Sequence, residues 1–230
     1  MITKQFLTRR FRDRADAGQI LANLLTEYAN RPDLLVLALP RGGVPVGFEV
    51  ATALSAPLDV FVVRKLGVPG REELAMGAVA TGGVIVLNED VVAALRIPRE
   101  TIDIRAADEQ RELARRERAY RGDRPPPEVR DRIVILVDDG IATGATMRAA
   151  VAALRQQKPA RIVVAVPTAA PESYDELRAE VDDIACVVTP EPFCAIGLWY
   201  EDFSQTTDEE VRNLLEQATS DPIPDKLFDS

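Results

Sequence analysis

Two adjacent aspartates, Asp138 and Asp139, are the strongest candidates for chemistry in this 230-residue sequence. They follow the apolar run Ile133–Val137 and precede a loop of small and hydroxylated residues that ends at Thr146. A helical pattern follows, so the loop could direct backbone N–H groups, threonine hydroxyls and the positive end of a helix toward one anion. The carboxylates also need a polar partner, because burying them unpaired is costly, and ribose hydroxyls or a hydrated Mg2+ would supply one.

The same segment excludes some chemistry. It is not a Walker A loop, because no Gly-Lys-Ser or Gly-Lys-Thr follows. A strand that simply ends in an Asp-Gly turn is the alternative, and the threonines with the helix behind them argue against it. The absence of histidine excludes Ser-His-Asp and Cys-His catalysis and His-ligated zinc. Cys186 and Cys194 form no CxxC motif, and Cys186, in an apolar run, is interpreted as a buried free thiol.

Two other loops combine glycine with cationic residues. Residues 40–43, Pro-Arg-Gly-Gly, follow an apolar run, and their glycines would let backbone amides approach an anion; a plain turn is the alternative. Residues 63–74 contain Arg64, Lys65 and Arg71 among glycine and proline, a composition that suits a mobile loop able to contact an anion. A solvated basic loop is the alternative there.

The elements that must position these loops follow from apolar runs bounded by glycine, proline or aspartate. Six strands are predicted, at Leu34–Leu39, Leu58–Val63, Val84–Leu87, Ile133–Val137, Arg161–Val166 and Ile184–Val188. Helical patterns lie between them, at Ala15–Tyr28, Val44–Leu54, Thr146–Gln156 and Glu172–Glu180. The alternation predicts an α/β fold with a mainly parallel twisted sheet flanked by helices, which binds ligands at the carboxyl edge of its strands.

Two segments interrupt this rhythm. Residues 78–86 read as a hairpin that turns at Gly82-Gly83. Residues 99–121 form a mixed-charge helical stretch, interpreted as a solvated helix or cap, with a partner-binding element as the alternative. We therefore expect one domain over residues 1–220 with this helix inserted in it, followed by a weakly ordered acidic tail at 221–230.

The net charge is −9 and the pI about 4.8, which argues against nonspecific binding to nucleic acid or to an anionic membrane. Residues 201–230 hold nine acids and two bases, so residues 1–200 carry only −2 of that charge and the acidity does not oppose an anion site. No apolar run approaches the roughly 18 residues of a membrane span, and we expect a cytoplasmic protein.

The segment 133–146 resembles the phosphoribosyl diphosphate (PRPP) signature of the type I phosphoribosyltransferases. The resemblance implies that Asp138 and Asp139 bind the ribose 2′- and 3′-hydroxyls and approach Mg2+ indirectly, through PRPP or water. It also implies that the loop wraps the 5-phosphate, with Gly140, Ala142, Thr143, Gly144, Ala145 and Thr146 as the contacts.

Three further segments resemble parts of that family. Residues Arg41, Gly42 and Gly43 match its pyrophosphate loop, where members often have a cis peptide, and residues 63–74 match its flexible catalytic loop. Residues 190–206 hold four aromatics within eleven positions and resemble the hood of purine-type members. This implies that Phe193 stacks on a base and that Glu201 or Asp202 approaches the metal; an aromatic patch that packs the C-terminal helix is the alternative.

The family transfers a ribosyl phosphate from Mg-PRPP to a nitrogen nucleophile through an oxocarbenium-like transition state. The resemblance implies that Arg64 and Lys65 neutralise the leaving pyrophosphate. It also implies nucleotide salvage with a purine-like acceptor. Many hypoxanthine-guanine members have an aspartate where this chain has Ala142, and this difference argues against a 6-oxopurine acceptor. The resemblance to adenine members implies Glu72 or Glu73 as the general base, unless the substrate needs little base assistance.

Two other classes of function stay open. One is a regulatory protein that binds PRPP or a nucleotide without catalysis, although the chain has no helix-turn-helix signature. The other is an unrelated α/β protein whose loop binds another phosphorylated ligand. The resemblance implies Mg2+ as cofactor, PRPP and a small heterocycle as partners, and a homodimer.

Overall fold

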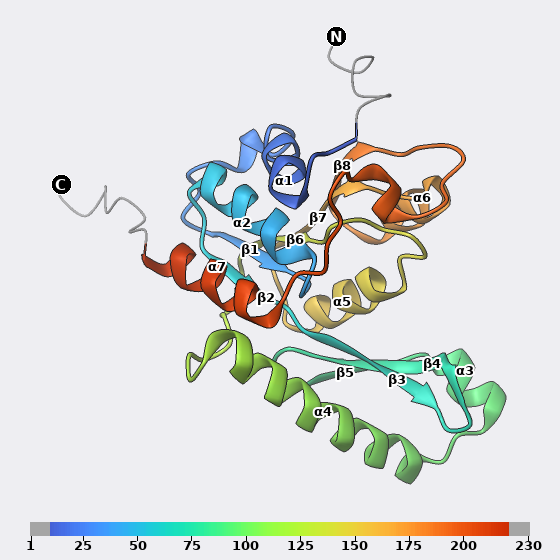
Figure 1. Ribbon diagram of the computed structural model, residues 1–230. Helices are drawn as coiled ribbons and strands as arrows, with labels where there is room; N and C mark the ends of the chain where they lie inside the picture. Colours follow the sequence, from blue (N-terminus) through green and yellow to red (C-terminus); the bar gives the residue numbers. More distant parts are fainter. Residues whose placement is uncertain (1–9, 221–230) are drawn as a thin grey trace.

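A five-stranded parallel sheet carries the candidate site in the computed structural model, which describes residues 10–220 (Figure 1). The strand order is β2-β1-β6-β7-β8, and every neighbouring pair is parallel, which confirms the predicted fold class. The bounds are β1 (Leu34–Ala38), β2 (Leu58–Val60), β6 (Ile133–Val137), β7 (Arg161–Thr168) and β8 (Asp183–Val188).

Helices cover both faces of this sheet. On one face lie α1 (Arg14–Ala22), α2 (Gly43–Leu54) and α7 (Asp208–Ser220); on the other lie α5 (Ala145–Gln156) and α6 (Pro171–Glu180). Alternate residues of one strand reach opposite cores, since Val36 packs with the α1 and α2 side and Leu37 with the α5 side. This explains why the central strands read as unbroken apolar runs.

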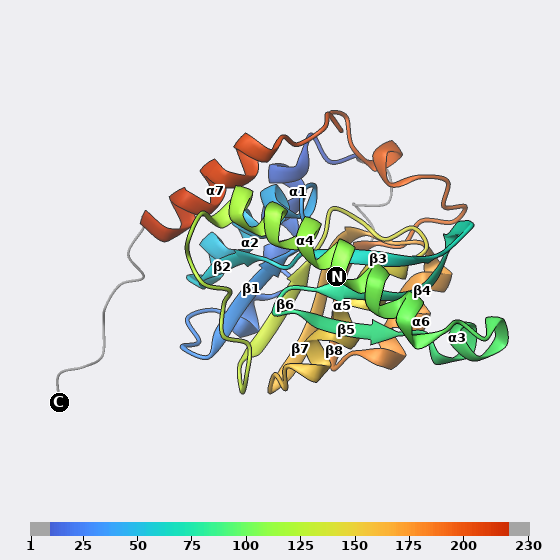
Figure 2. The same cartoon turned by 90° about the horizontal axis from the view of Figure 1, so that it is seen from below.

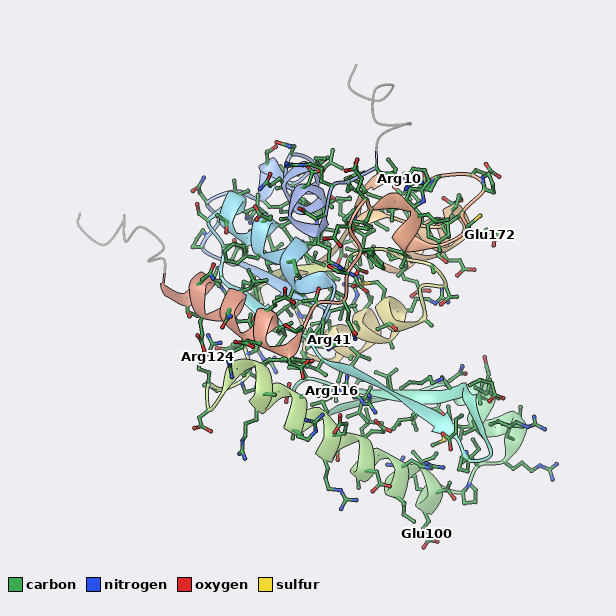
Figure 3. The ribbon with its side chains drawn as sticks, in the orientation of Figure 1. Arg10, Arg41, Glu100, Arg116, Arg124 and Glu172 are labelled. Atoms are coloured by element: carbon green, nitrogen blue, oxygen red, sulfur yellow. The ribbon has the colours of Figure 1, made fainter. Side chains whose placement is uncertain are left out.

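A second, antiparallel sheet projects from the first and is called the arm here. It consists of β3 (Val63–Val68), β4 (Arg71–Ala80) and β5 (Val84–Leu87), with α3 (Glu89–Leu95) at its outer end. The inserted helix α4 (Arg99–Arg121) packs along β3 and β4, so the small sheet lies between α5 and α4 (Figures 1 and 2). Figure 3 shows Glu100 at the outer end of α4, far from Arg124 beyond its inner end. The predicted hairpin at Gly82-Gly83 is confirmed, and both glycines have positive φ angles of 86° and 73°.

The largest differences from the predicted elements occur in three segments. The strand expected over 58–63 ends at Val60, because Val62 donates its N–H to the Thr81 hydroxyl and the chain passes into the arm. The segment 63–74, expected as a mobile loop, forms β3 and the start of β4. The helix expected over 15–28 ends at Ala22, and a 3-10 turn follows at Thr26–Tyr28.

Three other expectations concern parts of the chain away from the sheet. The acidic tail at 221–230 lies outside the described residues. Cys186 is half-buried rather than buried, and its thiol donates to the carbonyl oxygen of Val188 at 3.2 Å; Cys194 is exposed. Among residues 10–220, no helix has the length and apolar character to cross a bilayer.

Candidate functional site

The carboxyl ends of β1, β2 and β6 meet at one level of the sheet. Ala38 is paired with Val60 on one side and with Val137 on the other. Each strand is followed by one of the singled-out segments: residues 40–43 after β1, the arm after β2, and the two aspartates after β6. The parallel register therefore brings residues 40–43 into contact with the two aspartates. The arm begins at the same edge of the sheet.

The two aspartates are held in a tight, largely buried arrangement. Asp138 Oδ1 accepts the backbone N–H of Asp139 at 2.8 Å, and the Asp139 side chain is only 14% exposed. Burial and the neighbouring charge of Asp139 raise the pKa of Asp138 well above its ordinary value. Burial also raises the pKa of Asp139, against the opposing effect of the Arg14 guanidinium. A carboxyl pair held in this way gains from any ligand that donates hydrogen bonds to it or carries positive charge.

The loop after the aspartates encloses a cavity of about 200 Å3. Its lining comprises the expected Asp138, Asp139, Gly140, Ala142, Thr143, Gly144, Ala145 and Thr146, with Ile141, Met147 and Ile196. Ser173 Oγ donates to the carbonyl oxygen of Ala142 at 2.7 Å, and Arg148 donates to that of Thr143 at 3.0 Å. Helix α5 begins at Ala145, so its first-turn N–H groups and its positive end lie at this cavity, an environment that favours a phosphate group.

Residues 40–43 press against the aspartates. The Pro40–Arg41 peptide is cis, as the family resemblance implied. A Cβ atom on Gly42 would lie 2.0 Å from Asp139 Oδ2, and one on Gly43 would lie 2.7 Å from the carbonyl oxygen of Val137. These two positions therefore need glycine for close approach. Arg41, in contrast, reaches toward α7, and its guanidinium lies 3.6 Å from Asp208 Oδ1 (its position is labelled in Figure 3).

The arm holds the expected lid residues away from the cavity lining. Arg64 pairs with Glu109 of α4 at 2.7 Å, and Glu72 pairs with Arg105 of α4 at 2.8 Å. Lys65 Nζ donates to the carbonyl oxygen of Glu73 at 3.3 Å. The inserted helix is therefore not simply a solvated cap, because its charges engage two of the four residues expected to act in catalysis.

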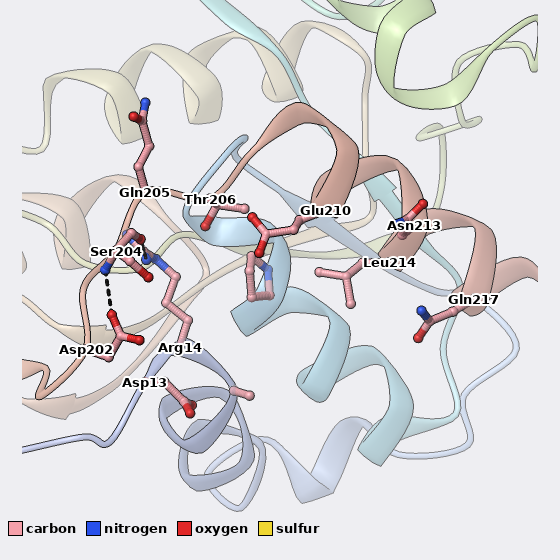
Figure 4. Close-up of a pocket in the computed structure, with 12 residues that line it drawn as sticks. Asp13, Arg14, Asp202, Ser204, Gln205, Thr206, Glu210, Asn213, Leu214 and Gln217 are labelled. Atoms are coloured by element: carbon pink, nitrogen blue, oxygen red, sulfur yellow. Dashed lines mark hydrogen bonds between the residues drawn. The ribbon is translucent and has the colours of Figure 1, made fainter.

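The hood segment, residues 190–206, closes over the loop with Ile196 rather than with Phe193. A Cβ on Gly140 would lie 2.6 Å from Ile196 Cγ2, whereas Phe193 is half-buried in the connection between β8 and the 3-10 turn Ile196–Trp199. Asp202 is exposed and accepts the backbone N–H of Ser204 at 2.9 Å. It lines a second cavity, of about 410 Å3, between the hood, α1 and α7 (Figure 4).

Arg14, which contacts one of the two aspartates, is absent from the sequence-based predictions. Arg14 donates from Nε to Asp139 Oδ2 at 2.9 Å, and Tyr200 donates its hydroxyl to the Asp139 carbonyl oxygen at 2.6 Å. Arg14 lies 125 positions from its partner, within a run of alternating charges at the start of a helix, and no motif marks it. Tyr200 was predicted only as part of the aromatic cluster in residues 193–203, with no role of its own.

The two carboxylates could hold a metal ion only together with a bound ligand that supplies further oxygen atoms. Among the described residues, no three Asp, Glu or Cys side chains gather as a metal site. The donor set at Asp138 and Asp139 is two adjacent carboxylates, which suits a hard, hydrated cation held jointly by a phosphorylated ligand.

Comparison with known proteins assigns the family. A model of the phosphoribosyl transferase domain matches residues 12–195. The crystal structure of TT1426 from Thermus thermophilus is 44% identical in sequence and superposes with a TM-score of 0.80, over 90% of this chain and 98% of that one. Two Mycobacterium tuberculosis proteins, provisionally named phosphoribosyl transferases, are 44% identical over 211 residues, which are 92% of this chain and 47% of theirs.

This chain belongs to the phosphoribosyl transferase domain family. It spans about half the length of the curated mycobacterial relatives that it matches. The family resemblance stated from residues 133–146 is thereby confirmed.

Proposed function

We propose that this chain transfers the 5-phosphoribosyl group of Mg-PRPP to a nitrogen of a small heterocyclic acceptor, with purine-like acceptors favoured, and releases pyrophosphate. The observation that carries the proposal is the convergence at one sheet edge of three features. These are a carboxylate pair, a glycine loop in contact with it and a cavity of about 200 Å3 at a helix N-terminus. Their chemistries suit a ribose diol, a pyrophosphate and a 5-phosphate in turn.

The reaction breaks the C1–pyrophosphate bond and forms a C1–nitrogen bond on the opposite face of the ribose. In this proposal, the loop 140–146 holds the 5-phosphate, and Asp138 and Asp139 accept hydrogen bonds from the ribose hydroxyls while their charge stabilises the cationic sugar. Arg41, with the amides of Gly42 and Gly43, binds the departing pyrophosphate. To bind that anion, Arg41 must break its ion pair with Asp208. Breaking the pair costs little free energy because both side chains are partly exposed.

The arm supplies the remaining groups. Arg64 and Lys65 neutralise the pyrophosphate, and Glu72 or Glu73 accepts the acceptor's proton, because Ala142 carries no acid at the loop. In the structure, Arg64 and Glu72 are paired with α4, so these roles require the arm to approach the edge and to exchange those pairs for substrate.

Asp138 and Asp139 would hold Mg2+ indirectly, through PRPP or water, and Asp202 is the further candidate from the hood. When bound, Mg2+ supplies charge neutralisation of the pyrophosphate.

The test is binding of Mg-PRPP by calorimetry, followed by a screen of bases for pyrophosphate release. The double variant Asp138→Asn with Asp139→Asn is expected to lose PRPP binding and to stay folded, since the amides preserve shape but remove both charges. A variant with Glu172→Gln and Asp175→Asn makes the same charge change on α6 and is expected to bind as the parent does. Unchanged PRPP affinity in the Asp138/Asp139 variant would overturn the proposal.

A non-catalytic PRPP- or nucleotide-binding protein is the second candidate. It is favoured by Ala142 in place of an acid and by the pairing of Arg64 and Glu72 with α4. The same screen separates the two functions: tight PRPP binding without pyrophosphate release for any base favours the regulator.

A further inference from the structure

The position of Arg14 is not explained by the helix that contains it. Arg14 is the first residue of α1, after the N-cap Asp13, which accepts the N–H of Asp16 at 2.8 Å. A cation in the first turn opposes the helix dipole, so this residue gains nothing from its own helix. Its side chain is nevertheless only 12% exposed, and an arginine is rarely so buried unless its N–H groups are paired.

The guanidinium joins three parts of the chain. Nε and Nη2 both lie on Oδ2 of Asp139, at 2.9 and 2.8 Å, and Nη1 donates to the carbonyl oxygen of Ser204 at 2.7 Å. The Arg14 Cζ also lies 4.1 Å from the ring centroid of Phe203, a cation–π distance. One side chain therefore ties α1 to the diacid and to the hood; Figure 4 shows Arg14 beside Ser204.

The glycine loop supports this pair from another side. A Cβ on Gly42 would lie 3.2 Å from Arg14 Nε as well as 2.0 Å from Asp139 Oδ2, so the loop backbone packs directly on the ion pair. The hood is fastened to the start of α1 by backbone bonds also, because Asp202 donates its N–H to Arg12 at 2.9 Å and Glu201 donates to Phe11 at 2.8 Å. The carboxylate of Asp139 thus has one oxygen fixed by Arg14, and Asp139 itself borders the phosphate-loop cavity.

We propose that Arg14 is a positioning residue for the ribose site, which fixes Oδ2 of Asp139 so that Oδ1 is presented to a ribose hydroxyl, and which links that orientation to the hood. The inference rests on the proposed function, since it requires a ribose ligand at Asp139. Its consequence is a specificity: recognition of the ribose hydroxyls depends on Arg14, whereas binding of the 5-phosphate by loop 140–146 does not.

The ligand pair that tests this is ribose 5-phosphate and 2,3-dideoxyribose 5-phosphate, which share the phosphate and differ in both hydroxyls. The parent is expected to prefer the ribose compound by roughly tenfold or more, the size of a hydrogen bond to a charged group. Arg14→Ala is expected to lose most of that preference and to weaken Mg-PRPP binding by roughly 10- to 100-fold, as when the outer partner of a ligating carboxylate is removed. Its affinity for the dideoxy compound is expected to change little.

Three variants control the experiment. Arg14→Lys keeps one donor near Asp139 and is expected to retain part of the preference. Phe203→Leu leaves the ion pair but removes the ring beside it, and should lower the preference by about two- to fivefold, the value of an exposed cation–π contact. Arg12→Ala removes a neighbouring arginine that pairs with Asp16 and is 61% exposed, and should bind both sugars as the parent does.

Each outcome is decisive. If the parent binds neither Mg-PRPP nor ribose 5-phosphate, the proposed function fails and this inference with it. If the parent shows the preference and Arg14→Ala retains it, or loses affinity for both sugars equally, Arg14 is merely structural and the inference alone is overturned. If Arg14→Ala does not fold, Arg14→Lys decides, because a full parental preference in that variant would contradict the positioning role.

Discussion

Asp138 is a buried carboxyl. Its hydrogen bond stabilises the ionised form less than burial destabilises that form. It accepts one backbone N–H, from Asp139, and has the charge of the same residue beside it. The Arg14 guanidinium that relieves this pair contacts Asp139 and not Asp138. The raised pKa means that the charged form of Asp138 costs free energy in the folded protein, whereas PRPP binding as proposed uses that form, so this position trades stability for ligand binding.

The variant Asp138→Asn is accordingly expected to be more stable than the parent at neutral pH. Because the pKa is higher in the folded state than in the unfolded chain, the folded state binds more protons between the two values. The parent's stability relative to Asp138→Asn therefore falls as the pH rises from the ordinary carboxyl range through the raised pKa. A shift of one pKa unit corresponds to about 1.4 kcal/mol, or a gain of roughly 3–6 °C in Tm for a chain of this size.

Thermal unfolding between pH 4 and pH 8 measures this effect. The difference between the two melting temperatures should shrink toward the acid end, as Asp138 becomes protonated in both the folded and the unfolded parent. Asp175→Asn, on the exposed side of α6, is the control and should follow the parent at every pH. A parent that is as stable as Asp138→Asn at pH 8 would contradict the assignment.

At the residue scale, sequence reasoning could identify groups whose neighbours in the chain give them a context. Asp138 and Asp139 sit between a buried strand and a loop of small residues, and Gly42 and Gly43 sit in a loop that matches a family pattern. Arg14 could not be identified, because its significance depends on a contact 125 positions away. Ile196 in place of Phe193 at the loop was missed for the same reason: which hood side chain faces Gly140 depends on the path of the chain between β8 and Ile196.

At the element scale, the arm changes what the expected mobile loop means. In β3, Leu66 and Val68 are buried and Arg64 pairs with α4, whereas Lys65 is exposed. β3 and β4 pair as a hairpin, with Gly70 in the turn at φ 76°. Helix α4 backs this hairpin, and Ile102 and Ala106 share a buried cluster with Leu66 and Met76. A lid built in this way would move as a small sheet together with α4, rather than as a flexible loop.

The Arg64–Glu109 pair gives the element-scale prediction. Each side chain is 28% exposed, so the pair is worth little more than a surface salt bridge. Glu109→Gln is expected to raise amide hydrogen exchange in β3 by about two- to fivefold, which corresponds to a loss of roughly 0.5–1 kcal/mol of local stability.

Glu112→Gln is the matched control, since Glu112 pairs with Arg115 and Arg116 within α4. It should leave amide hydrogen exchange in β3 unchanged. Neither variant should change amide hydrogen exchange in β1 or β6. Equal exchange in β3 for Glu109→Gln and the parent would show that the pair does not hold the hairpin to α4.

Element boundaries were predictable where a strand is buried on both faces. The predicted range for the strand at Ile133–Val137 is the observed one, and Leu34–Leu39 is one residue too long. The range Leu58–Val63 was wrong at its end because one apolar run serves two sheets: Val60 completes β2, Phe61 and Val62 cross over, and Val63 begins β3. Periodicity alone does not reveal where a chain leaves one sheet for another.

At the scale of the whole molecule, the two sheets share a buried cluster on the α1, α2 and α7 side. A single buried cluster contains Val36 and Ile135 of the large sheet, Leu66 and Met76 of the arm, Leu113 of α4 and Val211 of α7. Arg41 and Tyr120 also meet at Asp208, which joins the glycine loop, α4 and α7. Because the apolar contacts are continuous, the arm should not unfold apart from the sheet that carries the aspartates, as the expectation of one domain over residues 1–220 requires.

Met76→Ala tests this continuity. Met76 lies in β4 and is fully buried, so its truncation should cost about 3 kcal/mol, or roughly 6–12 °C in Tm. If the core is one cooperative unit, calorimetry of Met76→Ala will show a single transition, shifted downward, with equal calorimetric and van't Hoff enthalpies. Leu37→Ala, in the large sheet, should shift that same transition. An early separate transition in Met76→Ala alone would show that the arm folds as its own unit and would make it a body able to open independently of the site.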